Sequence, residues 1–329
     1  MTKKTAAIND LSGMGRCSLV ADISVLSAMG ISVNPVPTAV LTAQTEYEGY
    51  YSRECTGDLS HYLSHWSSLH ARFDGILTGY LADSSQTSFV RDFLKQFKTE
   101  ETTLLVDPVM GDDGFTYANF SPELLRDMRV LADYAEILTP NITELCLLTG
   151  ADPEKLLSSS APVLLEQIRV RARSLLNKPG KTILVTGLSD ALCRISAPDL
   201  SYEKSSPNVR ILHTAGGDPK TRDCSVTARD PKIGNLLVNG DAETLYLFPH
   251  EKGHFSGTGD LFAAAVLGGR LNGWSWNRTI QTAGSFLSVG VQDSVRAGTS
   301  SLDGIDYEKH LAMLMQPDPL QNTSATSKR

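Results

Sequence analysis

The run Gly-Thr-Gly-Asp at 257–260 holds the residues of this chain best suited to chemistry, and small apolar residues at 263–266 follow it in a helical pattern. Glycines permit a tight turn and a close backbone approach. A helix that begins there leaves several backbone N–H groups without internal partners and has partial positive charge at that end. Such a helix end binds a phosphate or the charge that develops during phosphoryl transfer. With Asp260 as proton acceptor for an attacking hydroxyl, the run predicts a kinase active site. A flexible loop in which Asp260 caps the helix is the alternative.

Acidic side chains upstream could hold the metal ion that phosphoryl transfer from a nucleotide requires. Asp107, Asp112, Asp113 and Glu144 offer carboxylate oxygens, which Mg²⁺ prefers as ligands, either directly or through water. Two alternatives stay open on local grounds. Asp112 and Asp113 are also typical of a solvated turn, and the segment 139–144 is also typical of a capped helix start.

Several known nucleotide-binding motifs are absent from the sequence. It contains no Gly-x-x-x-x-Gly-Lys-Ser/Thr run, and it lacks the His-Arg-Asp and Asp-Phe-Gly signatures of protein kinases. The glycines at 13–15 lack the third glycine that a dinucleotide fingerprint requires. The sequence therefore disfavours both a P-loop enzyme and a protein kinase.

Short apolar segments alternate with segments of helical periodicity along the first two thirds of the chain, which predicts a mainly parallel sheet with helices on both faces. The expected strands are 6–8, 31–41, 75–77, 104–106, 136–138 and 182–185, and the expected helices are 16–29, 58–70, 84–98, 121–132 and 162–177. In such sheets, ligands bind at the carboxyl ends of the strands. Polar residues stand at these ends throughout, namely Asp10, Tyr80, Asp107, Asn141 with Glu144, and Thr186.

Other segments depart from this alternation. Pro35 and Pro37 favour an edge or irregular strand at 31–41, and the polar, aromatic segment 42–57 is expected to be a loop or flap. A long hydrophilic excursion, partly mobile, is expected at 187–233.

The rest of the chain returns to regular structure before it ends. Asn239-Gly240 predicts a hairpin between strands at 234–239 and 243–248. Helices are expected at 275–292 and 304–314, and a disordered tail at 316–329.

Composition restricts the class of protein. The chain has 329 residues, is 41% hydrophobic and carries a net charge of −7, which disfavours nucleic acid as its main partner. No apolar run is long enough to span a bilayer, and the apolar run near the N-terminus is too short for a signal peptide. The expected protein is cytoplasmic, with no nucleic-acid or membrane partner.

Three motifs together resemble the signatures of the ribokinase-like superfamily. They are Gly257-Thr258-Gly259-Asp260, Asp107-Pro108-Val109-Met110-Gly111-Asp112 and Thr139-Pro140-Asn141-Ile142-Thr143-Glu144. Leu77-Thr78-Gly79-Tyr80 and the opening Ile8-Asn9-Asp10-Leu11-Ser12-Gly13-Met14-Gly15 are similar to the pyridoxal kinase branch, in particular to bacterial pyridoxamine/pyridoxal kinases. The resemblance covers roughly residues 5–295. It implies a three-layer α/β fold in a single kinase domain, 1–315, and a homodimer.

The resemblance also implies an activity, which is ATP-dependent phosphorylation of the 5′-hydroxymethyl group of pyridoxal, pyridoxamine or pyridoxine in vitamin B6 salvage. By position in the motifs, Asp260 would be the base, and the N–H groups of Gly257, Thr258 and Gly259 would form the anion hole. Asp107, Asp112, Thr139 and Glu144 would surround Mg²⁺, with K⁺ as a further candidate ion. The nucleotide would meet Asn141, Thr186 and Asp112, and the pyridine ring would meet Asp10, Thr45 and Tyr80.

Two alternatives to this function stay open. Asp10 is a feature shared with the hydroxymethylpyrimidine kinases of thiamine synthesis, and a non-catalytic B6-binding regulator would keep the same pocket. Glu46 is expected to join Asp10 near the ring and to favour the ammonium-bearing pyridoxamine, unless it points to solvent.

Overall fold

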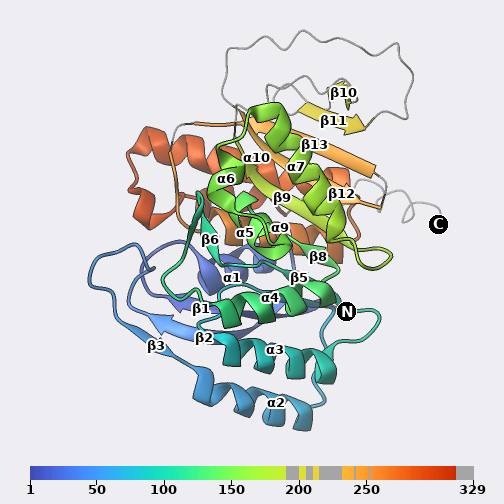
Figure 1. Ribbon diagram of the computed structural model, residues 1–329. Helices are drawn as coiled ribbons and strands as arrows, with labels where there is room; N and C mark the ends of the chain where they lie inside the picture. Colours follow the sequence, from blue (N-terminus) through green and yellow to red (C-terminus); the bar gives the residue numbers. More distant parts are fainter. Residues whose placement is uncertain (190–199, 205–209, 215–231, 241, 252, 316–329) are drawn as a thin grey trace, which may run out of the picture.

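The computed structural model describes residues 1–189, 200–204, 210–214, 232–240, 242–251 and 253–315, and a mainly parallel sheet forms its centre (Figure 1). Eleven strands follow the order β10-β11-β13-β12-β9-β8-β5-β4-β1-β2-β3. Their bounds are β1 (Lys4–Ser12), β2 (Ser32–Leu41), β3 (Ser52–Glu54), β4 (Gly75–Thr78), β5 (Thr103–Val106), β8 (Ile137–Leu138), β9 (Thr182–Leu188), β10 (Leu200–Lys204), β11 (Arg210–Thr214), β12 (Lys232–Asn239) and β13 (Ala242–Pro249). A separate two-stranded ribbon joins β6 (Gly111–Asp112) to β7 (Phe115–Thr116).

The six strands from β2 to β9 across the sheet run parallel, and they confirm the predicted fold class. The strands at the two margins run antiparallel: β12, β13, β11 and β10 on one side and β3 on the other. Since the parallel strands all point the same way, their carboxyl ends lie along one edge.

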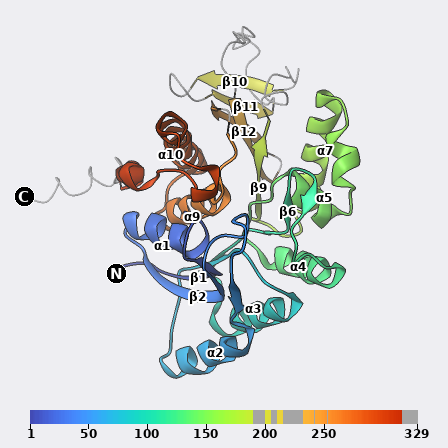
Figure 2. The ribbon, with the colours of Figure 1, turned by 90° about the vertical axis from the view of Figure 1, so that its left-hand side faces the viewer.

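Helices cover both faces of the sheet, so that the molecule has three layers (Figure 2). One face carries α1 (Ser18–Ala28), α9 (Thr258–Leu271) and α10 (Trp276–Ala297), with the 3₁₀ turns η3 (Ser301–Asp303) and η4 (Glu308–Met313) nearby. The other face carries α2 (Leu59–Ser68), α3 (Ser84–Phe97), α4 (Pro122–Tyr134), α5 (Ile142–Thr149), α6 (Pro153–Leu157) and α7 (Ala161–Ser174), after the 3₁₀ turn η1 (Thr56–Asp58).

The hydrophobic core has two parts, one on each face of the sheet, because successive side chains of a strand point to opposite faces. On β4, Ile76 packs into the cluster under α3 and α4, while Leu77 packs into the cluster under α1 and α9. On β5, Leu104 and Leu105 divide in the same way. The central strands are buried on both faces, which explains why they read as continuous apolar runs.

The irregular segments differ from expectation in detail. The expectation of an edge or irregular strand at 31–41 is met in part, because the register between β1 and β2 shifts between Asn9 and Leu11, and β3 pairs with β2 only at 39–41. The stretch that contains Pro35 and Pro37 pairs only with β1 among the described strands, so two residues without an N–H are tolerated there. The predicted flap, 42–57, contains β3 and the start of η1, which the sequence did not indicate.

The excursion at 187–233 also contains structure that periodicity missed. β10 and β11 lie within it and extend the sheet beyond β13. The expected mobility of the rest concerns residues outside the described ranges, as does the expected tail at 316–329. The hairpin at Asn239-Gly240 is confirmed, with β12 and β13 antiparallel around it.

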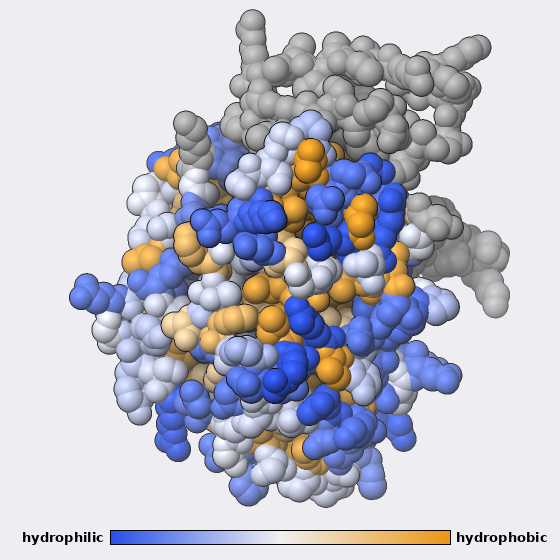
Figure 3. All heavy atoms as spheres, in the orientation of Figure 1, coloured by the Kyte–Doolittle hydropathy of each residue, from blue (hydrophilic) through white to orange (hydrophobic). Residues whose placement is uncertain are grey.

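One face of the molecule is seen in the space-filling view (Figure 3), and it is mainly hydrophilic. In Figure 3 hydrophilic side chains cover most of the visible face, and apolar residues interrupt them in small groups. Among the described helices, none is both long and apolar enough to cross a membrane.

Candidate active site

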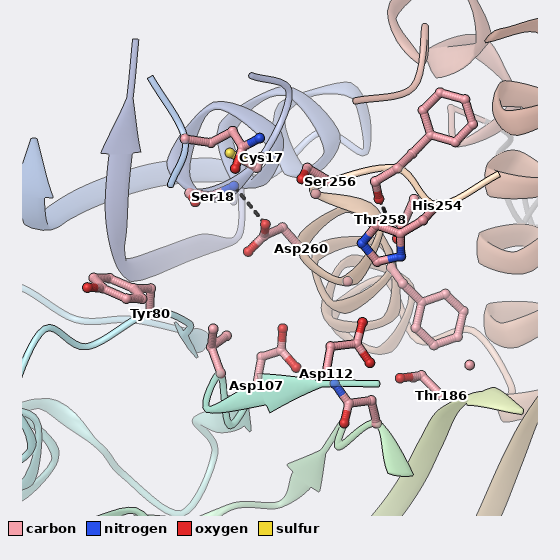
Figure 4. Close-up of a pocket in the computed structure, with 18 of the residues that line it drawn as sticks. Cys17, Ser18, Tyr80, Asp107, Asp112, Thr186, His254, Ser256, Thr258 and Asp260 are labelled. Carbon is pink, nitrogen blue, oxygen red and sulfur yellow. Dashed lines mark hydrogen bonds between the residues drawn. The ribbon is translucent and has the colours of Figure 1, made fainter. Parts of the chain in front are cut away.

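A cleft of about 1020 Å³ lies where the carboxyl ends of the parallel strands meet the starts of α5 and α9. Every residue that the sequence predicted for the site lines it: Asp10, Thr45, Tyr80, Asp107, Asp112, Thr139, Asn141, Glu144, Thr186, Gly257, Thr258, Gly259 and Asp260. Tyr80 lies at one end of the close-up view and Thr186 at the other, with Asp260 and Asp107 between them (Figure 4).

Gly257 begins helix α9 in the left-handed region, with φ of +80°. A Cβ at this position would stand 2.2 Å from the carbonyl oxygen of Arg16, so only glycine allows the turn to lie against the start of α1. The starts of α9 and α1 are thereby brought together, and both helix ends contribute partial positive charge.

Asp260 lies in the first turn of α9, but its carboxylate does not cap that helix. Its Oδ2 accepts a hydrogen bond from the backbone N–H of Ser18 (2.8 Å), and its Oδ1 accepts one from Asn9 Nδ2 (3.1 Å). Ser18 is the first residue of α1, whose N-cap residue Cys17 makes no side-chain cap bond. Asp260 therefore does cap a helix, as the alternative prediction has it, but that helix is α1 and not α9, to which Asp260 belongs.

Burial raises the pKa of the two carboxyls at the centre of the cleft, Asp260 and Asp107. It raises the pKa of Asp260 to about 6, even though the bonds from Ser18 and Asn9 favour the ionised form. Burial and the charge of Asp260 raise the pKa of Asp107 to about 7. The hydroxyl of Thr139 donates to Asp107 Oδ1 over 2.8 Å, and this hydrogen bond lowers the pKa of Asp107.

Glu144 takes part in a capping box and also faces the carboxylate cluster. Its Oε2 accepts from the backbone N–H of Asn141 (2.9 Å), and Asn141 Oδ1 accepts from the Glu144 N–H (2.9 Å). Glu144 Oε1 accepts from the N–H of Met110. Burial first, and then the charge of Asp107, raise the pKa of Glu144 well above its usual range.

The donor set fits a cation that keeps part of its water. Within the described part of the chain, no group of three His, Cys, Asp or Glu side chains is already arranged to hold a metal ion. Asp107 and Glu144 are nevertheless buried, and each has a raised pKa: burial and the charge of Asp260 raise that of Asp107, and burial and the charge of Asp107 raise that of Glu144, as expected for negative charges without a counter-ion. Mg²⁺ needs only one or two carboxylates when substrate phosphates and waters complete its shell.

Asp10 and Tyr80 form the wall at the Tyr80 end of the cleft. Asp10 is 5% exposed, and its Oδ2 accepts from the hydroxyl of Ser12. Burial raises the pKa of Asp10, and burial together with the charge of Asp10 raises the pKa of Tyr80 to about 12. Thr45 is exposed and reaches the cleft from the segment between β2 and β3.

At the Thr186 end, Asn141 already uses its side chain within the protein, because its Nδ2 donates to the carbonyl oxygen of Gly111 (2.8 Å). Asp112 lies on β6, and burial raises its pKa, opposed by the nearby His254. Glu46 Oε1 lies 3.9 Å from His254 Nε2, and His254 is drawn away from Tyr80 in Figure 4. The expectation that Glu46 joins Asp10 at the ring is therefore not met by this geometry.

Sequence reasoning missed several residues in the cleft or behind its lining. Asn9 donates to Asp260 and to Asp22, and neither Asn9 nor Asp22 was singled out. Asn9, a polar residue within an apolar strand and directly before Asp10, was a signal that could have been used. His254 had no such signal, because its position facing Asp112 depends on the path of the loop before α9.

Comparison with known proteins assigns the class. The model of the phosphomethylpyrimidine kinase family matches residues 14–213. The chain belongs to this family, and its three-layer fold is consistent with a small-molecule kinase. A crystal structure from Bacteroides thetaiotaomicron that is assigned to the phosphomethylpyrimidine kinases and contains pyridoxal is 30% identical, with a TM-score of 0.73 over 97% of this chain and 98% of that one.

Relatives of this chain include proteins that are named as kinases of pyridoxal, a narrower class than the family as a whole. Pyridoxal kinase of Sus scrofa is 27% identical over 74% of this chain and 67% of its own length. The pyridoxine/pyridoxal/pyridoxamine kinase of Bordetella avium is 25% identical over 90% of this chain and 87% of its own length. The resemblance of the sequence to pyridoxal kinases is thus confirmed.

The raised pKa of Asp107 predicts a stability effect. A carboxyl whose pKa in the folded state lies above its usual value of about 3.9 lowers the stability of the fold as pH rises from that value to the folded pKa, and the full cost remains at higher pH. Asp107→Asn, which keeps an acceptor for Thr139, is therefore expected to raise Tm at pH 8. The gain should shrink as pH falls from about 7 toward 4, because the carboxyl then becomes protonated in the unfolded chain as it already is in the folded one. Thermal unfolding across this range checks it; a Tm gain independent of pH would contradict the assigned cause.

Proposed function

We propose that this protein is an ATP-dependent kinase of vitamin B6 that phosphorylates the 5′-hydroxymethyl group of pyridoxal, pyridoxamine and pyridoxine. The observation that supports it most is Asp260, a buried carboxylate held by Ser18 and Asn9 in the cleft, with a pKa of about 6. A carboxylate with this pKa is ionised at neutral pH and accepts a proton from an alcohol. The pyridoxal kinases among the relatives support the vitamers as acceptors.

The remaining roles follow the geometry of the cleft. The N–H groups of Gly257, Thr258 and Gly259 stabilise the transferred phosphoryl group at the start of α9. Asp107, Asp112, Thr139 and Glu144 would hold Mg²⁺ with nucleotide phosphates and water, and a monovalent ion such as K⁺ would add positive charge. Thr186 and Asn141 face the nucleotide, and Asp10, Thr45 and Tyr80 face the ring. The kinase acts as a homodimer.

The charge of the cleft favours ATP accompanied by cations. Its described lining includes no Lys or Arg but eight carboxyl side chains: Asp10, Glu46, Glu54, Asp107, Asp112, Asp113, Glu144 and Asp260. A polyphosphate in such surroundings requires bound cations to offset like-charge repulsion.

The second candidate is a kinase of hydroxymethylpyrimidine or of its phosphate, and the same charges weigh against the phosphate as acceptor. An alcohol acceptor must lose a proton, for which Asp260 is placed. A phosphate acceptor needs no such base, and its negative charge would lie beside Asp260 with Asp10 and Asp107 nearby. ADP release measured with each vitamer, hydroxymethylpyrimidine and its phosphate separates the candidates. Turnover of hydroxymethylpyrimidine or its phosphate without turnover of any vitamer would overturn the proposal, and turnover of none would favour a binding protein.

Asp260→Asn tests the base. It is expected to lower kcat by roughly 10²–10⁴-fold while leaving KM for ATP nearly unchanged, because only proton removal is lost. In wild type, kcat should decline as pH falls through about 6, when Asp260 becomes protonated. The residual activity of the variant should lack this decline. A kcat within a few-fold of wild type would leave Asp260 only its role at the start of α1.

Glu144→Gln tests the metal role against the capping role. If Glu144 contributes a metal-shell oxygen, the variant needs more Mg²⁺ for half-maximal activity. It should also gain less Tm than wild type when Mg²⁺ and ADP are added. Asp152→Asn, at the N-cap of α6, is the matched control for loss of a capping charge. A Mg²⁺ titration as in wild type would assign Glu144 to the capping box alone.

Substitutions at Asp10 and Glu46 test which end of the cleft receives the ring. Asp10→Asn is expected to lower kcat/KM for pyridoxal, pyridoxamine and pyridoxine together, because the ring contact is common to them. Glu46→Gln should leave the ratio of pyridoxamine to pyridoxal unchanged, since Glu46 faces His254. A fall in that ratio would return Glu46 to the ring.

A further inference from the structure

Asn9 makes hydrogen bonds to four residues in or beside the cleft, and none of the roles assigned so far includes it. It lies on β1, is 1% exposed, and uses its whole side-chain amide. Nδ2 donates to Asp260 Oδ1 and to Asp22 Oδ2, each over 3.1 Å. Oδ1 accepts from the backbone N–H groups of Asp10 (3.0 Å) and Tyr80 (2.8 Å). Both amide hydrogens and both oxygen lone pairs are therefore in use.

The orientation of this amide has one solution. Turned by half a rotation, the NH₂ group would face the N–H groups of Asp10 and Tyr80, and the oxygen would face two carboxylates. Four favourable contacts would become four repulsive ones. The site also leaves no room for movement, because a Cβ on Gly79 would lie 2.4–2.6 Å from the amide atoms of Asn9.

Asp22 is the third part of the arrangement. It lies on α1, is fully buried, and has no hydrogen-bond partner at Oδ1. A buried carboxyl with an unpartnered oxygen costs stability, so packing alone does not account for it. Its Oδ2 accepts a hydrogen bond from the amide of Asn9, whose second hydrogen points to Asp260.

We propose that Asn9 is a positioning residue for the catalytic carboxylate, and that Asp22 holds the Asn9 amide in the orientation that this requires. This inference rests on the proposed kinase function. Asp260 is then held at both oxygens, by Asn9 and by the N–H of Ser18, which fixes the plane of its carboxylate. The same amide holds the backbone of Asp10 and Tyr80, so the base and the wall at the Tyr80 end keep a constant relative position.

Two substitutions test the role of Asn9, one at Asn9 itself and one at the neighbouring Gly79. Asn9→Leu removes all four bonds and is expected to lower kcat per folded molecule by roughly 10–100-fold, the scale of a misplaced reacting group. KM for ATP should stay within about threefold, because the nucleotide lies at the other end of the cleft. Gly79→Ala keeps every polar group but displaces the amide, so it should lower kcat in the same way. It remains informative if Asn9→Leu does not fold.

Asp22 allows a test by its conservative variant. Asp22→Asn keeps an acceptor oxygen for the Asn9 amide and is expected to retain kcat within about threefold. Asp22→Leu has similar size but no acceptor, so kcat should fall. A role in folding alone would lower the Tm of Asp22→Leu without lowering kcat per folded molecule.

Gln86→Leu is the matched control. Gln86 is also a fully buried amide, which donates to the carbonyl of Thr38 and the hydroxyl of Thr56 and accepts from the N–H of Ala82, and it lies outside the cleft lining. Its loss is expected to lower Tm and leave kcat per folded molecule unchanged.

All variants are compared by steady-state ADP release with pyridoxal, and the folded fraction is measured by circular dichroism. A lower kcat in Asn9→Leu or Gly79→Ala, together with an unchanged one in Gln86→Leu, supports the inference. Wild-type kcat per folded molecule in the Asn9→Leu and Gly79→Ala variants overturns it, and equal kcat in the two Asp22 variants removes Asp22 from the arrangement. Wild type inactive with every vitamer would instead reject the proposed function, so the two failures are distinguishable.

Discussion

The contact on which the site depends is the hydrogen bond from the backbone N–H of Ser18 to the carboxylate of Asp260, residues 242 positions apart. It joins the starts of two helices that lie on the same face of the sheet. Ser18 has φ of 53°, a conformation that non-glycine residues adopt rarely and at a cost. The packing of Gly257 against the backbone of Arg16 and Cys17 holds this geometry. A charged group in the cleft thus replaces the missing cap of α1.

This arrangement brings several carboxylates of like charge together in surroundings that are poorly hydrated, which lowers the stability of the fold. Asp10, Asp22, Asp107 and Glu144 are each 8% exposed or less, Asp260 is half-buried, and each of the five carboxyls has a raised pKa. Such a cluster opposes folding at neutral pH, and bound cations would offset its charge. Activity and stability therefore make opposite demands on the same side chains. The amide of Asn9 reduces the conflict, because it donates to two carboxylates at once.

Much of the fold could be predicted because its signals are local. The alternation of short apolar runs with helical periodicity indicated the parallel sheet, and the turn at Asn239-Gly240 indicated the hairpin of β12 and β13. β3, β10 and β11 were missed, since short strands without apolar alternation are defined by the neighbour with which they pair. The domain boundary at 315 stays a prediction.

The residue types and motif spacing by themselves determined which side chains belong to the cleft, because the carboxyl ends of parallel strands and a glycine-rich helix start are recognisable along the chain. Only the tertiary structure decided how these side chains are used. It committed Asn141 and Glu144 to a capping box, turned Glu46 toward His254, and brought Asn9 and Asp22 to Asp260. The reason is physical: the partner of a buried polar group, and with it the pKa of that group, depends on distances between segments that are remote in the sequence.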